Sequence, residues 1–167
     1  MARHLPTLYL RDTAQAMSQG NLEMVRRCYE AVNRGDFETI FSVCDPAVEF
    51  EPPERAPYAG TYRGVDGVRE LLQSLLEAWR DIRWEPERFF ETGDRVVVFV
   101  KMAVRSQSSD AQIGVRVGHF LEMRDGKIMR FKIFPEREEA LEAAGLSAAR
   151  GIAPGAGSPR STNGGDV

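Results

Sequence analysis

Three side chains, Glu51, Arg116 and His119, could move a proton or hold a negative charge. Glu51 ends the alternating segment 47–51, whose pattern is typical of a strand. A carboxylate at the mouth of an apolar cavity loses hydration, which raises its pKa and makes it a better base near neutral pH. His119 can act as an acid, a base or a hydrogen-bond donor, and Arg116 can bind an enolate or carboxylate oxygen. Together they predict a general acid–base site.

Each of these residues also has a structural interpretation. Glu51 can lie on the solvent face of an edge strand, and Arg116 can pair with Glu122 on a wet part of a sheet. His119 follows Gly118 in a strand, so strict alternation places the two residues on opposite faces of the sheet. The alternation does not say which of these faces is the inner one.

Helical periodicity comes first in the chain, and strand-like alternation follows it. Asp-Gly between alternating segments predicts a tight hairpin, so the strands should pair in order as an antiparallel meander. Helices grouped before such a sheet indicate an α+β fold, here a cone-shaped curved antiparallel sheet with the N-terminal helices packed over its concave face. The predicted helices cover 21–34, 37–44, 65–80 and 136–144, and the predicted strands cover 47–51, 82–92, 95–105, 113–123 and 127–134.

The two ends of the chain differ from its centre. Residues 1–20 show weak periodicity and are predicted to form an N-terminal arm, either mobile or carrying a short extra helix. Asn21 is a good cap for the first strong helix. Residues 21–147 form the predicted domain. Residues 148–167 are rich in Gly, Pro, Ser and Ala and are predicted to be a disordered tail, because they bury too little apolar surface to offset their ordering entropy.

The composition excludes several classes of function. The 167 residues carry a net charge of −3, which argues against binding nucleic acid through its phosphates. No apolar run approaches the length of a membrane span, and no signal-peptide pattern opens the sequence, so the cytoplasm is the expected location. Cys28 and Cys44 have no partner at metal-ligand spacing. We therefore expect no metal and no cofactor.

Four segments together resemble the SnoaL-like (nuclear-transport-factor-2-like) superfamily: 25–37, 45–50, 62–69, and 118–120 with 124–128. The resemblance covers about 21–146 and implies the α+β cone with an apolar pocket. This superfamily includes ketosteroid isomerases, polyketide cyclases, dehydratases, epoxide hydrolases and proteins without known catalysis, so the fold alone does not give the function.

The resemblance also implies roles for individual residues. Glu51 falls at the base position of the ketosteroid isomerases, and Cys28 and Gly118 fall where that family has its two oxyanion donors. On this alignment both donors are missing, Gly118 faces the pocket, and His119 faces away towards packing or a subunit interface. The predicted catalytic residues are Glu51, His119 and Arg116, and the predicted substrate-binding residues are Tyr29, Tyr58, Trp79, Gly118, Phe120 and Phe131.

The function expected from these observations is a cofactor-independent isomerase, cyclase or hydratase that acts on a small apolar ring compound. The alternatives are a non-catalytic module that binds a small apolar molecule, and a dimeric interaction module. Whichever of these functions holds, the protein is expected to form a homodimer. Its interface would be the Val96, Val98 and Val100 side of one strand or the opposite Val97 and Phe99 side.

Overall fold

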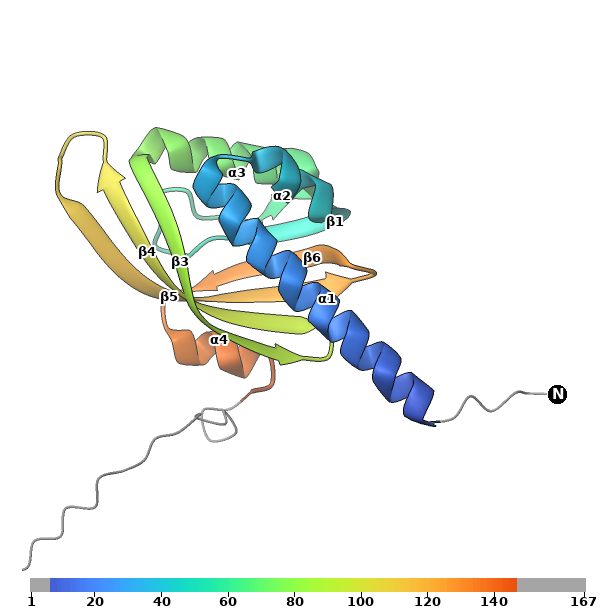
Figure 1. The fold of residues 1–167 in the computed structure, drawn as a ribbon. Helices are drawn as coiled ribbons and strands as arrows, with labels where there is room; N and C mark the ends of the chain where they lie inside the picture. Colours follow the sequence, from blue (N-terminus) through green and yellow to red (C-terminus); the bar gives the residue numbers. More distant parts are fainter. Residues whose placement is uncertain (1–6, 147–167) are drawn as a thin grey trace, which may run out of the picture.

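The computed structural model describes residues 7–146, and side chains from residue 19 onwards. Helices and a curved six-stranded sheet follow one another in the α+β order that the sequence predicts (Figure 1). The elements are α1 (Thr7–Arg34), α2 (Phe37–Val43), β1 (Cys44–Glu51), β2 (Tyr62–Arg63), α3 (Gly64–Ala78), β3 (Trp79–Thr92), β4 (Arg95–Ser106), β5 (Gln112–Arg124), β6 (Lys127–Phe134) and α4 (Arg137–Ala143).

The sheet has the strand order β2-β1-β6-β5-β4-β3. Strands β3 to β6 form the predicted antiparallel meander. The hairpin between β5 and β6 turns at Asp125 and Gly126, both of which have positive φ, as a type I′ turn requires. The place of β1 was not predicted: it pairs with β6 in parallel, so that Phe50 lies beside Phe131.

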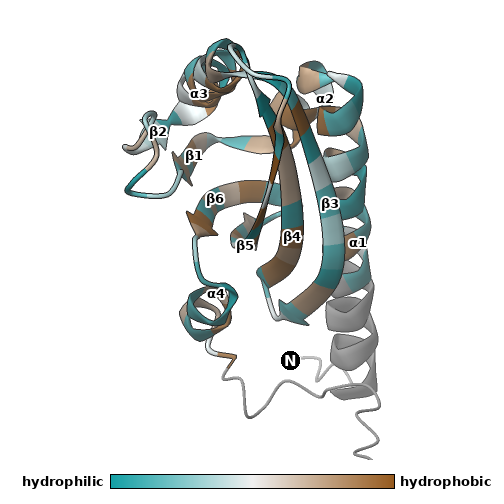
Figure 2. Ribbon diagram, turned by 90° about the vertical axis from the view of Figure 1, so that its left-hand side faces the viewer, coloured by the Kyte–Doolittle hydropathy of each residue, from teal (hydrophilic) through white to brown (hydrophobic). Residues whose placement is uncertain are grey.

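Apolar stripes on the helices cover the concave face of this sheet. Val68, Leu71 and Leu75 of α3 are buried, as are Val25 and Tyr29 of α1. Facing them, β4 is hydrophobic along most of its length (Figure 2). This arrangement confirms the predicted fold class.

The junction between α1 and α2 lies where the predicted helices 21–34 and 37–44 meet. Gly35 has φ +73, and its amide donates to the Val32 carbonyl at 3.1 Å, so it ends α1 in the left-handed conformation that glycine adopts without strain. Asp36 caps α2, because its Oδ1 accepts from the Thr39 amide at 3.3 Å.

The predicted start of the first helix was wrong. Helix α1 begins at Thr7 and runs through Asn21, which is therefore not a cap. Gly20 and Asn21 each disfavour a helix by only about 1 kcal/mol or less, which good helix formers such as Ala14 and Ala16 can offset. Residues 7–20 of the predicted arm thus belong to a helix, whereas the predicted tail lies outside the described residues.

Helix α4 covers part of the opposite, convex face. Val97 and Phe120 are buried beneath it, and Gly118 lies directly under Ala140. On the concave face, Val96, Val98 and Val100 belong to the main core. These four valines are thus packed inside the chain and cannot form the surface of a dimer interface. The homodimer itself stays a prediction. Among the described helices, none has both the length and the hydropathy needed to cross a membrane.

Candidate functional site

The interior between α1, α3 and the concave sheet face contains three small apolar hollows. The α1 hollow, of about 60 Å³, is lined by Cys28 and Tyr29 among others. The loop hollow, of about 50 Å³, lies beneath Pro53 and Tyr58 of the loop after β1. The edge hollow, also of about 60 Å³, lies beside Ile82 of the edge strand β3. No carboxylate is among the residues that line these three hollows in the described structure.

A hydrogen-bonded pair lies in this apolar interior. His119 of β5 has no exposed surface, and its Nδ1 lies 2.8 Å from the hydroxyl oxygen of Tyr29 of α1. The pair is surrounded by rings: the centroids of Trp84 and Phe131 each lie 4.9 Å from that of the imidazole. Tyr29, Trp84 and Phe131 all line the α1 hollow. His119 is not among the residues that line any of the three hollows, so it lies behind these rings.

Burial keeps both partners neutral. It lowers the pKa of His119 from 6.5 to about 3, because a charged imidazolium would lose its hydration. Burial, with a smaller contribution from Cys28, raises the pKa of Tyr29 well above 10. At pH 7 the site therefore presents a neutral imidazole and a neutral phenol.

Nε2 of His119 is buried and has no hydrogen-bond partner among the described residues. Two neutral arrangements of the pair are possible. If Tyr29 donates to Nδ1, only the Nε2–H donor is left without a partner. If Nδ1–H donates to Tyr29, both the phenolic proton and Nε2 are left without one. Since an unpaired buried group costs about 1–3 kcal/mol, the first arrangement is favoured, and it makes Nε2–H a hydrogen-bond donor.

Trp84 is held in place beside this pair by Asn33, near the end of α1. The Asn33 side-chain amide donates to the Trp84 carbonyl at 2.8 Å and accepts from the Trp84 amide at 2.9 Å. Because β3 is an edge strand, these two bonds satisfy backbone groups that would otherwise lack a protein partner. The indole is thereby fixed against the imidazole.

The predicted sheet faces for β5 were wrong. His119 points to the concave interior, whereas Gly118 and Phe120 lie on the convex face under α4. Arg116 shares that convex face, where it is exposed and lies 3.7 Å from Glu87. The β4–β5 register runs without a shift, so no bulge reverses the alternation. Of the two positions that the resemblance implied for oxyanion donors, Gly118 lies on the convex face, while Cys28 lines the α1 hollow. The hydrogen-bonded polar pair of the interior lies one residue later in each case, at Tyr29 and His119.

Glu51 also lies on the convex face. Its neighbour Phe50 stacks on Phe131 in the core, so alternation along β1 turns Glu51 the other way. Its carboxylate pairs with Arg130 at 3.1 Å and with Lys132 at 3.2 Å. Partial burial raises the pKa of Glu51, but the hydrogen bonds and charges of Lys132 and Arg130 outweigh burial and lower it overall. The raised pKa expected from the sequence is therefore wrong.

The remaining predicted binding residues divide between the interior and its edges. Tyr29 and Phe131 line the α1 hollow, and Tyr58 lines the loop hollow. Trp79 follows α3 directly and packs against the core without lining any of the three hollows. Trp84 is not among the binding residues predicted from the sequence. Its signal was present, since Trp84 alternates with the charged residues Arg83 and Glu85 and so must face inward.

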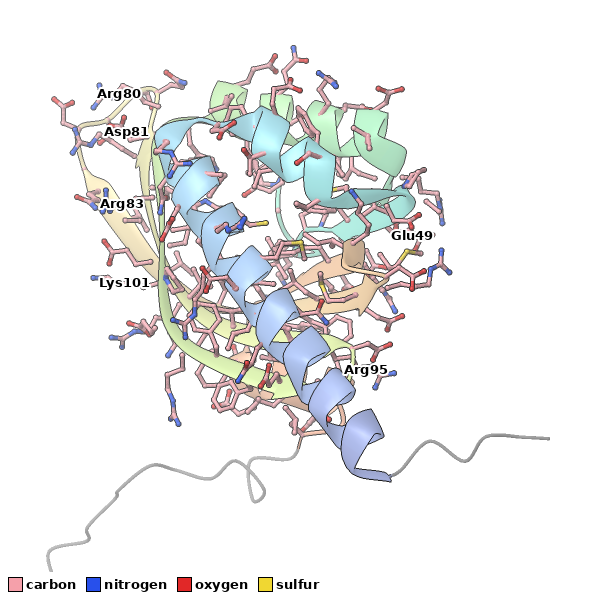
Figure 3. All side chains as sticks on the ribbon, turned by 45° about the vertical axis from the view of Figure 1, so that its right-hand side comes forward. Glu49, Arg80, Asp81, Arg83, Arg95 and Lys101 are labelled. Carbon is pink, nitrogen blue, oxygen red and sulfur yellow. The ribbon has the colours of Figure 1, made fainter. Side chains whose placement is uncertain are left out.

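A larger groove, of about 310 Å³, lies at the outer edge of β3 and β4. Arg105 and Asp81 of its lining lie 3.7 Å apart, and Arg83 of its lining lies 3.4 Å from Glu85, which is outside the groove. Asp81 and Arg83 are solvent-exposed, and Arg105 is half-buried. Figure 3 shows Asp81, Arg83 and Lys101 pointing outward from this edge. Surface ion pairs of this kind contribute little to stability, so they do not mark a specialised site. We therefore take the apolar interior as the candidate site. Across the described residues, no group of three or more potential metal ligands comes together.

Comparison with known proteins shows the family to which this chain belongs. The SnoaL-like domain family model matches residues 25–131, so the chain belongs to the SnoaL-like domain family. None of the curated proteins matches the chain.

Solved structures agree with the family. An NTF2-like protein of unknown function from Burkholderia pseudomallei K96243 is 25% identical, with a TM-score of 0.66, over 74% of this chain and 95% of its own. TerC, co-crystallized with polyporic acid, is 30% identical, with a TM-score of 0.66, over 75% of this chain and 98% of its own. A candidate SnoaL-like polyketide cyclase from Jannaschia sp. CCS1 shares the fold at 16% identity and a TM-score of 0.62, over 70% of this chain and 85% of its own.

Proposed function

We propose that this SnoaL-like protein binds a small apolar ring compound bearing a carbonyl oxygen, and that His119, positioned by Tyr29, donates a hydrogen bond to that oxygen. The observation that carries the proposal is the buried Nε2 of His119, which has no partner among the described residues. A buried donor without a partner destabilises the empty protein, and a ligand oxygen would remove that penalty. The α1 hollow is lined by the ring neighbours of His119, namely Tyr29, Trp84 and Phe131, but not by His119 itself, and it supplies the contact surface for a ring. A ligand oxygen therefore reaches Nε2 only when one of these rings moves aside.

The chemistry that such a donor supports is stabilisation of an enolate. A neutral donor fixed in a water-excluded site stabilises negative charge that develops on a carbonyl oxygen, and removing one donor of this kind slows a reaction by about 10²- to 10³-fold. Ketosteroid isomerase uses a tyrosine with a second neutral donor for this purpose. The activity we propose is therefore that of a cofactor-independent isomerase, cyclase or hydratase that works by proton transfer next to a carbonyl group.

Binding without turnover is the second candidate function. It is favoured by the absence of a carboxylate among the described residues that line the hollows, because proton abstraction needs a base within reach. Glu51 is the base that the family resemblance implies, yet it is paired with Arg130 and Lys132 on the convex face. The two candidates share one binding site and differ only in whether a proton is moved.

The binding proposal is tested by calorimetry and thermal shift with single-ring ketones such as 2-cyclohexen-1-one, together with polyporic acid because TerC was co-crystallized with it. A ligand that binds only the folded state must raise the melting midpoint. The matched control is His119→Phe, which keeps an aromatic ring and removes Nε2. We expect binding to weaken by about 2- to 10-fold in this variant, the usual contribution of one neutral hydrogen bond. Equal affinity in both proteins would refute the role of Nε2.

The turnover proposal is tested in D₂O by following, with NMR, the exchange of protons next to the ketone carbonyl. Exchange that depends on the wild-type protein and falls about 10²-fold in His119→Phe would support an enolate-stabilising enzyme. Glu51→Gln tests whether Glu51 is the base, because loss of exchange in this variant would identify it as the group that takes the proton. Since Glu51 lies on the convex face, we expect the exchange to be retained. Binding without any exchange would select the second candidate.

A further inference from the structure

We infer that Leu72 of α3, together with Trp84 of β3, sets the largest ring system that the interior accepts; this inference rests on the proposed function. Leu72 and Trp84 line the α1 hollow, the loop hollow and the edge hollow alike. Among the residues whose side chains are described, no other lines all three. These two side chains are therefore the common wall that divides one apolar interior into three compartments.

The two halves of this wall differ in how firmly they are held. Trp84 has both backbone polar groups bonded to Asn33, and its ring lies edge-on to His119 with centroids 4.9 Å apart. Leu72 is an aliphatic side chain that is only half-buried, between the buried Leu71 and Leu75 of the same helix. Leu72 is thus the part of the wall that can rotate or be shortened without breaking a polar contact.

The volumes show what the wall excludes. Each hollow measures about 50 to 60 Å³, whereas an apolar protein cavity that binds benzene is on the order of 150 Å³. A single ring in one of these hollows therefore needs Leu72 to rotate away from Trp84. A fused two-ring compound needs the space that Leu72 occupies. The ligand class that follows is a single-ring ketone rather than a fused polycyclic one.

The test measures the affinities of 2-cyclohexen-1-one and 1-tetralone, which have one ring and two fused rings, by calorimetry. The variants are Leu72→Ala, which shortens the wall, and Leu72→Met, which keeps its volume. The matched control is Leu71→Ala, the same substitution one position earlier, at a buried residue that lines the loop hollow only. The melting midpoint of each variant checks that it is folded.

Wild type and Leu72→Met should prefer the single-ring ketone. Leu72→Ala should raise the affinity for 1-tetralone relative to 2-cyclohexen-1-one by about tenfold or more, the usual effect of one or two methylenes of pocket space. An unchanged ratio, or an equal rise in Leu71→Ala, would overturn the role of Leu72. If Leu72→Ala does not fold, Leu72→Val carries the same test with a smaller rise. Failure of every protein to bind either ketone would refute the proposed function itself, while His119-dependent binding with an unchanged ratio would refute only the role of Leu72.

Discussion

Lowering the pH from 7.5 to 5 should destabilise this protein through His119. The unfolded chain has an ordinary histidine pKa of about 6.5, whereas burial lowers the pKa of folded His119 to about 3. Between these values the unfolded state binds a proton that the folded state does not, so stability is lost as the pH falls. Each pH unit within that window removes about 1.4 kcal/mol, so about 2 kcal/mol is lost by pH 5.

The assay is urea unfolding at several pH values in this range, with His119→Phe as the reference. The reference cannot titrate at this position, so the free energy of unfolding of wild type should fall about 2 kcal/mol further than that of His119→Phe. Asp36, Glu51 and Glu87 have pKa values lowered in the folded state, so their contribution is lost mainly below the ordinary carboxylate pKa and outside this window. Equal losses in the two proteins would refute the reasoning. So would an imidazole signal that titrates near 6.5 in wild type and is missing from His119→Phe, because that signal belongs to His119 and not to His4.

Two further predictions concern the elements that position the site. In Gly118→Ala the new Cβ would lie 2.6 Å from the Cβ of Ala140, so α4 must shift and the free energy of unfolding should fall by about 1–3 kcal/mol, whereas Gly114→Ala meets no atom nearer than 3.9 Å and should be nearly neutral. Asn33→Ala removes both bonds to the Trp84 backbone and should cost about 1–3 kcal/mol in urea unfolding, while Asn33→Asp keeps the acceptor and should lose less. A neutral Asn33→Ala, or matching losses in the two glycine variants, would contradict these accounts.

The sequence predicted the elements well because their signals are local. The Asp125-Gly126 turn, the Gly35-Asp36 junction and the apolar stripe of α3 each depend on residues close together in the chain, and each lies where it was expected. The parallel pairing of β1 with β6 had no local signal. It joins Phe50 to Phe131, far apart in sequence, and their stacking at 4.6 Å is visible only once the sheet is assembled.

The site itself was predicted in part. Alternation fixes which residues of β5 share a face, but the face that becomes the interior depends on where α1 and α4 pack. A one-residue error in alignment therefore placed Gly118, instead of His119, on the concave face. On α1, Cys28 and Tyr29 both line the α1 hollow, and Tyr29 is the one that bonds to His119. Glu51 moved to the convex face for a similar reason, since Phe50 and not Glu51 contacts the core.

A double-mutant cycle at Tyr29 and His119 separates a structural pair from a functional one. Tyr29→Phe alone leaves Nδ1 without its partner, and His119→Phe alone leaves the Tyr29 hydroxyl without one, so each should cost about 1–3 kcal/mol of stability. The double variant replaces both partners by apolar rings of similar shape, so its stability should return to that of wild type or exceed it, because the unpaired Nε2 is removed as well. Ketone binding should stay weak in the double variant. If the double variant regained both stability and ketone binding, the Tyr29–His119 pair would have a packing role alone. We expect the double variant to regain stability but not binding, because the polar atoms that bind the ligand are then missing.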